Sequence, residues 1–189
     1  MKRSFEQDLA DAVAYHGHLC GGQIIGTRAS RLGLEYFGIE DARTYRDLIA
    51  FVEADRCIAD AVSSVANCHI GRRRLKWHDM GKMAVSFHDL ASNRAVRICS
   101  INENRPETEL SADELVAFYN AIPDAEFFKV EEVVVQLDRF DLPGKPLRRV
   151  KCEVCGERVL DGRDVEKDGK TLCKHCAGID RYYKVLTKE

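Results

Sequence analysis

Two Cys-x-x-Cys pairs near the end of this 189-residue chain constrain its folding more than any other feature. The pairs are Cys152 with Cys155 and Cys173 with Cys176, and 17 residues separate them. Each pair can present two thiolates from one tight turn, and four thiolates fill the tetrahedral shell of a zinc ion. A filled shell leaves no position for a substrate, so we predict a structural Zn²⁺ site. An iron–sulfur or rubredoxin-type site is the alternative.

The residues around the cysteine pairs predict a small β-hairpin followed by a helix. Asp168-Gly169 has the composition of a two-residue hairpin turn. The second pair is predicted to open a helix that continues to Val185. Knuckle, hairpin and helix in this order resemble a treble-clef finger. A fragment of about 40 residues is too small to fold on its own apolar core, which agrees with a structural metal.

A second group of metal-ligating residue types lies near the start of the chain, in the stretch HGHLCGG at residues 16–22. His16, His18 and Cys20 alternate, and alternate side chains of an extended segment share one face. A helix is predicted to follow Gly22, and a helix N-terminus favours a thiolate at Cys20. The pattern predicts a metal site or a reactive thiol. The alternative is a buried apolar thiol beside ordinary loop histidines.

Another thiol, Cys57, follows the apolar run of residues 48–52, which is predicted to be a buried strand. Asp55 would cap the next helix and leave Cys57 in its first turn. We therefore predict a core site made by His18, Cys20 and Cys57, with His16 as a fourth ligand or as a partner of a ligand. Zn²⁺ is the expected ion and Ni²⁺ or Fe²⁺ the alternatives. Cys57 could equally serve as a packing residue.

The order of predicted elements favours the α+β class. Helices are predicted from Phe5 to about Tyr15, from Gly22 to Gly38, after Asp55, and after Ser111. Ser4 with Gln7 and Ser111 with Glu114 form capping boxes. Strands are predicted at residues 48–52, 82–90, 94–101 and 127–137. These elements do not alternate as regular βαβ units, which argues against a doubly wound parallel sheet.

Composition places the chain among ordinary globular proteins, with 45% hydrophobic and 32% charged residues. It has no apolar run near 18 residues and no apolar segment after Lys2-Arg3, so we expect neither a membrane span nor a signal peptide. Eight cysteines then point to metal or catalysis in a reducing cytoplasm. Residues 145–189 carry 12 basic and 8 acidic residues, a net charge of +4, which is far from strongly basic.

The stretch at residues 16–22 resembles the HGHxCxG signature of the formylmethanofuran dehydrogenase FmdE family. The likeness continues in residues 53–61, 71–75 and 79–82 and covers most of residues 10–140. It implies an α+β core at residues 1–140, with helices packed on an antiparallel sheet, a metal cleft at the signature and a tightly intertwined homodimer. Residues 141–189 would then be a linker and the treble-clef finger that some members carry.

The resemblance also suggests ligands and a function. It implies that Lys82 and Asp55 are cleft groups. Arg72 and Arg73, in a run of three arginines, would hold a small anionic ligand if they border that cleft, although such a run is usually a solvated face. The family is named after a subunit of a molybdenum- or tungsten-dependent enzyme that fixes carbon dioxide. An accessory or catalytic subunit for such chemistry is therefore one expectation.

Two other functions are compatible with the sequence. The finger could bind nucleic acid or a protein partner, or the core could sense or carry a metal. The first of these predicts a basic face on the finger, for which the candidates are Arg148, Arg149, Lys151, Arg158, Lys170 and Lys174. A nucleophilic Ser/His/Asp set, a phosphate-binding loop and a dinucleotide-binding fingerprint are not recognisable in the sequence, so these common enzyme classes gain no support.

Overall fold

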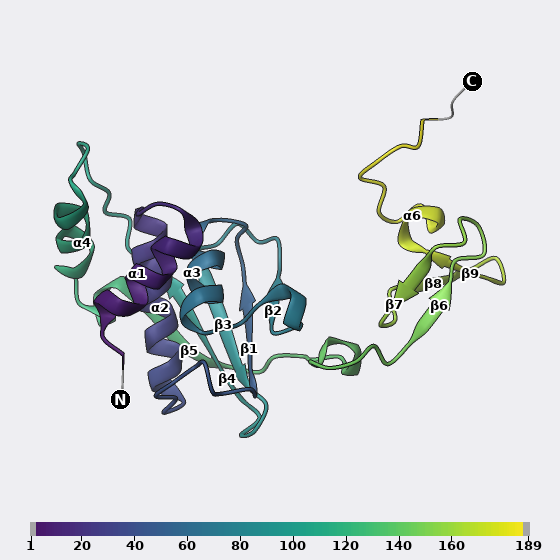
Figure 1. Ribbon diagram of the computed structural model, residues 1–189, viewed down its shortest axis with the longest axis horizontal. Helices are drawn as coiled ribbons and strands as arrows, with labels where there is room; N and C mark the ends of the chain where they lie inside the picture. Colours follow the sequence, from purple (N-terminus) through teal and green to yellow (C-terminus); the bar gives the residue numbers. More distant parts are fainter. Residues whose placement is uncertain (1–2, 187–189) are drawn as a thin grey trace. The chain divides into compact units, whose positions relative to one another are not determined.

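The computed structural model describes residues 3–186 and divides into two compact units after Gln136 (Figure 1). The first unit combines helices with one five-stranded sheet, and the second is a small module of two hairpins and a short helix. This arrangement confirms the α+β prediction. Among the helices of residues 3–186, none is both long and apolar enough to cross a membrane.

The helices of the first unit begin largely where the sequence predicts them. They are α1 (Phe5–His16), α2 (Gly21–Tyr36), α3 (Cys57–Val65), α4 (Ala112–Asn120) and the short α5 (Asp124–Phe127). Both capping boxes are present, at Ser4 and at Ser111. The predicted cap at Asp55 is wrong: Arg56 occupies the N-cap position with extended backbone, and no side chain caps α3.

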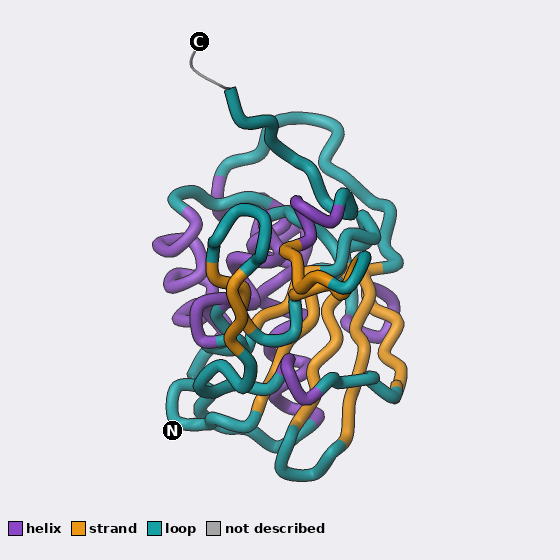
Figure 2. The backbone as a smooth tube through the Cα atoms, turned by 90° about the vertical axis from the view of Figure 1, so that its right-hand side faces the viewer, coloured by secondary structure: helices purple, strands orange, loops and turns teal. Residues whose placement is uncertain are grey.

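The sheet has the strand order β2-β1-β3-β4-β5, and Figure 2 shows its strands running side by side. Its strands are β1 (Leu48–Val52), β2 (Leu75–Trp77), β3 (Ala84–Asp89), β4 (Arg94–Ser100) and β5 (Phe128–Val133). Neighbouring strands are antiparallel except β1 and β2. Strand β2 is not among the predicted strands, because three residues with one buried apolar side chain show no alternation.

Small residues on α2 let the helices approach one another and the sheet closely. A Cβ atom at Gly26 would lie 2.5 Å from Cβ of Ala61 on α3, and one at Gly33 would lie 2.3 Å from the Phe87 ring on β3. The apolar core of this unit is formed by α1, α2 and α3 against one side of β1, β3 and β4. This packing fixes the positions of the helix ends that carry the candidate ligands.

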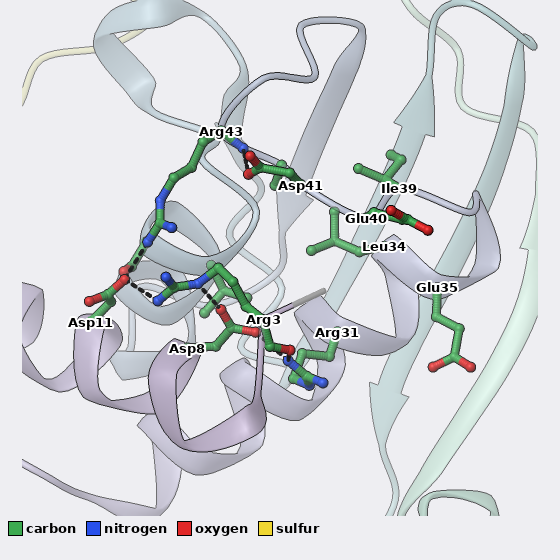
Figure 3. A pocket seen from close by; sticks show the side chains of 13 residues that line it. Arg3, Asp8, Asp11, Arg31, Leu34, Glu35, Ile39, Glu40, Asp41 and Arg43 are labelled. Atoms are coloured by element: carbon green, nitrogen blue, oxygen red, sulfur yellow. Dashed lines mark hydrogen bonds and ion pairs between the residues drawn. The ribbon is translucent and has the colours of Figure 1, made fainter. Parts of the chain in front are cut away.

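Ion pairs around buried Asp8 and exposed Asp11 tie the beginning of α1 to α2 and to the segment after it (Figure 3). Asp8 accepts hydrogen bonds from Arg3 (2.7 Å) and from Arg31. Asp11 pairs with Arg3 and Arg43 at 2.5 Å each. These side chains line a hollow that none of the predicted metal ligands lines, and their mutual pairing indicates a structural role.

The second unit consists of β6 (Arg149–Lys151), β7 (Arg158–Leu160), β8 (Asp164–Lys167), β9 (Lys170–Cys173) and α6 (Lys174–Ala177). The predicted hairpin is present: β8 pairs with β9 around Asp168 and Gly169. The prediction of a helix continuing to Val185 is wrong. Helix α6 ends at Ala177 because Gly178 adopts a left-handed conformation with φ of 78°.

Candidate metal centres

Three predicted ligands from the first unit come together at the ends of three helices. His16 is the last residue of α1, Cys20 is the N-cap of α2, and Cys57 is the first residue of α3. One ligand atom from each lies within 4.8 Å of the others, and all three residues are half-buried. One imidazole and two thiols at this separation could hold a metal ion.

His16 is oriented by a carboxylate. Its Nδ1 atom lies 2.8 Å from Oδ2 of Asp60, which is one turn along α3 from Cys57. Its Nε2 atom is buried and has no hydrogen-bond partner. A carboxylate on one ring nitrogen fixes the tautomer and leaves the lone pair of the other for a metal ion. A histidine held in this way can ligate a metal ion.

The segment that carries the histidines is not extended, contrary to our prediction. His16 still belongs to α1, and Gly17 turns the chain with φ of 100° before α2 begins. The alternation predicted for His16, His18 and Cys20 therefore fails at His16, whereas Cys20 itself has extended backbone. His18 is exposed and lies outside the group of three, with its ring centroid 4.6 Å from that of His16.

Gly22 leaves the space that the side chain of Cys57 needs beside α2. A Cβ atom at this position would lie 2.8 Å from Cβ of Cys57, 3.5 Å from Sγ of Cys57 and 3.8 Å from Sγ of Cys20. Another contact comes from Gln23, whose Nε2 atom donates to the Cys57 carbonyl at 2.7 Å. The first turn of α2 therefore packs directly on the beginning of α3.

The protein environment without a metal favours a protonated Cys57. Burial, with the neighbouring Cys20 thiol as the next cause, raises the pKa of Cys57 above its usual value, even though the residue begins a helix. The backbone hydrogen bond that lowers the pKa of Cys57 is thus outweighed by burial and by the neighbouring sulfur. A divalent cation between the two sulfurs would instead favour the thiolate form of Cys57, since thiols bind zinc as thiolates.

The residues proposed for anion binding have different environments. Arg72 donates to Oδ1 of Asn67 at 3.2 Å, and Arg73 ends a short 3₁₀ helix in a left-handed conformation. Arg74, the third arginine, is buried and donates to the carbonyls of Leu48 and Tyr45, so its role is structural. Lys82 is exposed.

The four cysteines of the second unit also form one group, with sulfur atoms within 4.8 Å of one another. Sγ of Cys155 lies 4.0 Å from Sγ of Cys173. The backbone N–H groups of Cys155 and Cys173 are the main cause that lowers the pKa of Cys152 to about 6. A thiol held as a thiolate among three others fits the structural zinc predicted from the spacing.

Sequence reasoning missed Asp60 and Gln23 as supporting residues. Asp60 could have been found, because a residue three positions after Cys57 in a helix lies on the same side. Nothing in the sequence distinguishes Gln23 from a surface residue of an amphipathic helix. Its contact with Cys57 arises from how α2 and α3 pack.

Comparison with known proteins finds a matching family for each of the two units. Residues 15–129 match the model of the family described as "FmdE, Molybdenum formylmethanofuran dehydrogenase operon". Residues 145–182 match that of the prokaryotic dksA/traR C4-type zinc finger. The first match spans the three-ligand group, and the second spans all four cysteines of the finger.

Two similar proteins extend this result. A probable S-adenosyl-L-methionine-binding protein of Archaeoglobus fulgidus is 31% identical over 94% of this chain, and the chain spans 54% of that protein, about half its length. The solved structure of a tungsten formylmethanofuran dehydrogenase FmdE-like protein from Syntrophus aciditrophicus has a TM-score of 0.60 at 20% identity, with 96% of each chain covered. The chain therefore belongs to the FmdE family and carries a C-terminal C4 zinc finger.

Proposed function

We propose that the core of this metal-binding FmdE-type protein holds one divalent ion through Nε2 of His16 and the sulfurs of Cys20 and Cys57. The observation that carries the proposal is the group of His16 with two thiols, in which the Nδ1 atom of His16 contacts Asp60 and the buried Nε2 atom has no hydrogen-bond partner. Zn²⁺ suits the nitrogen and sulfur donors, with Ni²⁺ or Fe²⁺ as alternatives. Such an ion would supply Lewis-acid chemistry, and three protein ligands would leave room for a bound small molecule.

Neighbouring residues would determine which small molecules bind at the proposed metal ion. We propose His18 as a fourth ligand or as a group that gates the open position, because its ring lies against that of His16. Arg72, Arg73 and Lys82 are proposed to bind an anionic part of the ligand. Contact between the His69 and Tyr15 rings, with centroids 6.3 Å apart, brings the loop that carries the arginines to the end of α1 beside His16.

At the level of the whole protein, we propose an accessory or catalytic subunit linked to molybdenum- or tungsten-dependent formylmethanofuran dehydrogenase-like chemistry. Membership of the family supports this assignment. We also propose that the protein works in the cytoplasm as an intertwined homodimer with residues 1–140 as its functional core, as the family resemblance implies. A metal-carrying protein is the alternative for the same centre, and it predicts rapid exchange of the core ion.

Cobalt substitution tests the core centre without an activity assay. With the finger loaded with Zn²⁺, the protein should bind one further Co²⁺ and develop sulfur-to-cobalt charge-transfer bands. Addition of imidazole should then shift the visible cobalt bands, because the centre has an open position. The Cys57→Ala variant should lose the charge-transfer intensity or bind no Co²⁺. An unchanged spectrum in this variant, or no response to imidazole in the wild type, would contradict a core metal centre with a free coordination position.

A second role, in which the finger binds a partner, is supported by exposed basic side chains of the finger that form no ion pair within residues 3–186. Arg148, one of the predicted basic residues, is neutralised by Asp164. By contrast, no ion pair involves Arg149, Lys151 or Arg158 within residues 3–186, and all three are exposed. We propose that this surface contacts an anionic partner.

A further inference from the structure

Three cations lie on one face of the β6–β7 hairpin. Lys151 is directly opposite Arg158 in the strand register, and Arg149 is two residues along β6, on the same side of the strand. Like charges placed opposite each other across a β-ladder are destabilising. The described part of the chain brings no carboxylate to them within ion-pair distance. We call Arg149, Lys151 and Arg158 the basic face.

An aromatic groove adjoins the basic face and shares Arg158 with it. The groove has a volume of about 420 Å³ and is lined in part by Leu160, Lys174, His175, Tyr182 and Tyr183. The rings of His175 and Tyr183 are stacked, 4.2 Å apart and 6° from parallel. Tyr182 is 89% exposed and touches Tyr183 only edge-on, so a face of its ring is open to a further planar group.

We infer that the finger binds single-stranded nucleic acid, with phosphates on the basic face and a base stacked on Tyr182 at the aromatic groove. The inference rests on the proposed interaction role of the finger and is independent of the core metal. Positive charge that follows a phosphate backbone, together with aromatic rings that stack on bases, is the usual basis of single-strand binding.

Two acidic residues that line the groove favour a nucleic acid over an acidic protein as its occupant. Glu157 and Asp180 also line it. These carboxylates would repel an acidic side chain that entered the groove, whereas they can accept hydrogen bonds from the amino groups of a base. Helix α6 has four residues and is too short to read a major groove, which favours a single strand over a duplex.

Fluorescence anisotropy with a labelled 12-nucleotide oligo(U) tests the inference on the full-length, zinc-loaded protein. The wild type should bind, and the affinity should fall with added salt. The double variant Lys151→Gln/Arg158→Gln should bind at least about tenfold more weakly and reduce the salt slope by about 1.4, at roughly 0.7 per lost phosphate contact. Tyr182→Ala should weaken binding about 5- to 100-fold with the salt slope unchanged.

A charge-matched control separates the basic face from net charge. Arg139→Gln/Lys145→Gln removes two exposed cations of the second unit that lie outside the face and do not line the groove, and it should change the affinity less than about threefold. All variants must retain the zinc content of the wild type. Equal losses in the control and in the Lys151→Gln/Arg158→Gln variant would overturn the inference.

Two further outcomes would also overturn it. One is binding of a 12-base-pair duplex as tight as that of the single strand and insensitive to Tyr182→Ala. The other is the absence of oligonucleotide binding at low salt. If the protein binds no oligonucleotide but still binds a labelled polyglutamate peptide through the basic face, the finger has an interaction role that does not involve nucleic acid. The peptide measurement thus distinguishes failure of this inference from failure of the broader proposal.

Discussion

At the scale of single residues, the candidate core centre depends on which histidine faces the thiols. The sequence indicates that His16, His18, Cys20 and Cys57 belong together, but not their order of importance. We favoured His18 on the assumption of extended backbone, whereas α1 extends through His16 and Gly17 turns the chain. The carboxylate partner, Asp60, comes from another helix. Side-chain direction at a helix end is set by backbone geometry that residue spacing alone does not reveal.

The contact between Asp60 and His16 predicts a specific defect. Asp60→Asn should keep the fold but weaken metal binding at the core about 10- to 100-fold, because the imidazole loses the carboxylate that orients it. Competition with a chromophoric chelator measures the affinity at each site. The finger should be unaffected, and Asp113→Asn, a substitution in the first turn of α4, should leave both sites unchanged. Equal core affinity in Asp60→Asn and wild type would contradict a ligand role for His16.

Gly22 offers a test based on packing. In Gly22→Ala the new methyl group would meet Cβ of Cys57 at 2.8 Å, so α2 or α3 must shift. We expect a loss of about 1–3 kcal/mol in stability and a marked loss of core metal. The matched control is Gly71→Ala, where no atom lies within 4 Å of the added methyl. Thermal unfolding and metal content would be measured on both, and similar behaviour of the two variants would argue against close packing at the thiols.

At the scale of elements, local signals predicted most of the first unit. Capping boxes located α1 and α4, and a run of apolar residues located β1, because these features act within a few residues. Strand β2 was missed for the opposite reason, whereas the end of helix α6 was misplaced although its signal, Gly178, is local. β2 exists through its parallel pairing with β1, a contact between segments distant in sequence. The apolar residues after Gly178 suggested a helix, but the glycine ends it.

The sheet face opposite the helices carries a buried ion pair with a testable pH dependence. Arg97 donates to both carboxylate oxygens of Glu53 at 2.6 and 2.7 Å. This pairing with Arg97 lowers the pKa of Glu53 below its ordinary value. A depressed carboxyl pKa stabilises the fold above the unfolded-state pKa of about 4.3, and the contribution is lost as pH falls through the folded-state pKa.

Glu53→Gln should therefore destabilise the first unit by about 2–3 kcal/mol at neutral pH, and the difference from wild type should shrink below about pH 4. Urea unfolding followed by fluorescence of Trp77, the single tryptophan, reports on this unit alone. Glu132→Gln breaks an exposed pair with Arg94 and should cost less than about 1 kcal/mol. A Glu53→Gln difference that stays constant down to pH 3 would refute the linkage.

At the scale of the whole molecule, residues 3–186 contain two groups of side chains that could hold a metal ion, one in each of the two units. The finger group was predictable in full, because two Cys-x-x-Cys pairs specify the ligands and their geometry without tertiary information. The core group was predictable only as a set of candidates, because its members come from three helix ends that the sheet and helix packing bring together. The different number of ligands in the two groups, four against three, suggests different roles.

Metal analysis of purified protein tests the central claim most directly, with Cys20→Ala and Cys152→Ala compared with the wild type. The wild type should contain two metal ions per chain and each variant one, with the loss confined to the altered unit. Cys57→Ala provides a second core variant if Cys20→Ala does not fold. A single metal ion in the wild type, lost in Cys152→Ala and retained in both core variants, would contradict a metal centre at His16, Cys20 and Cys57.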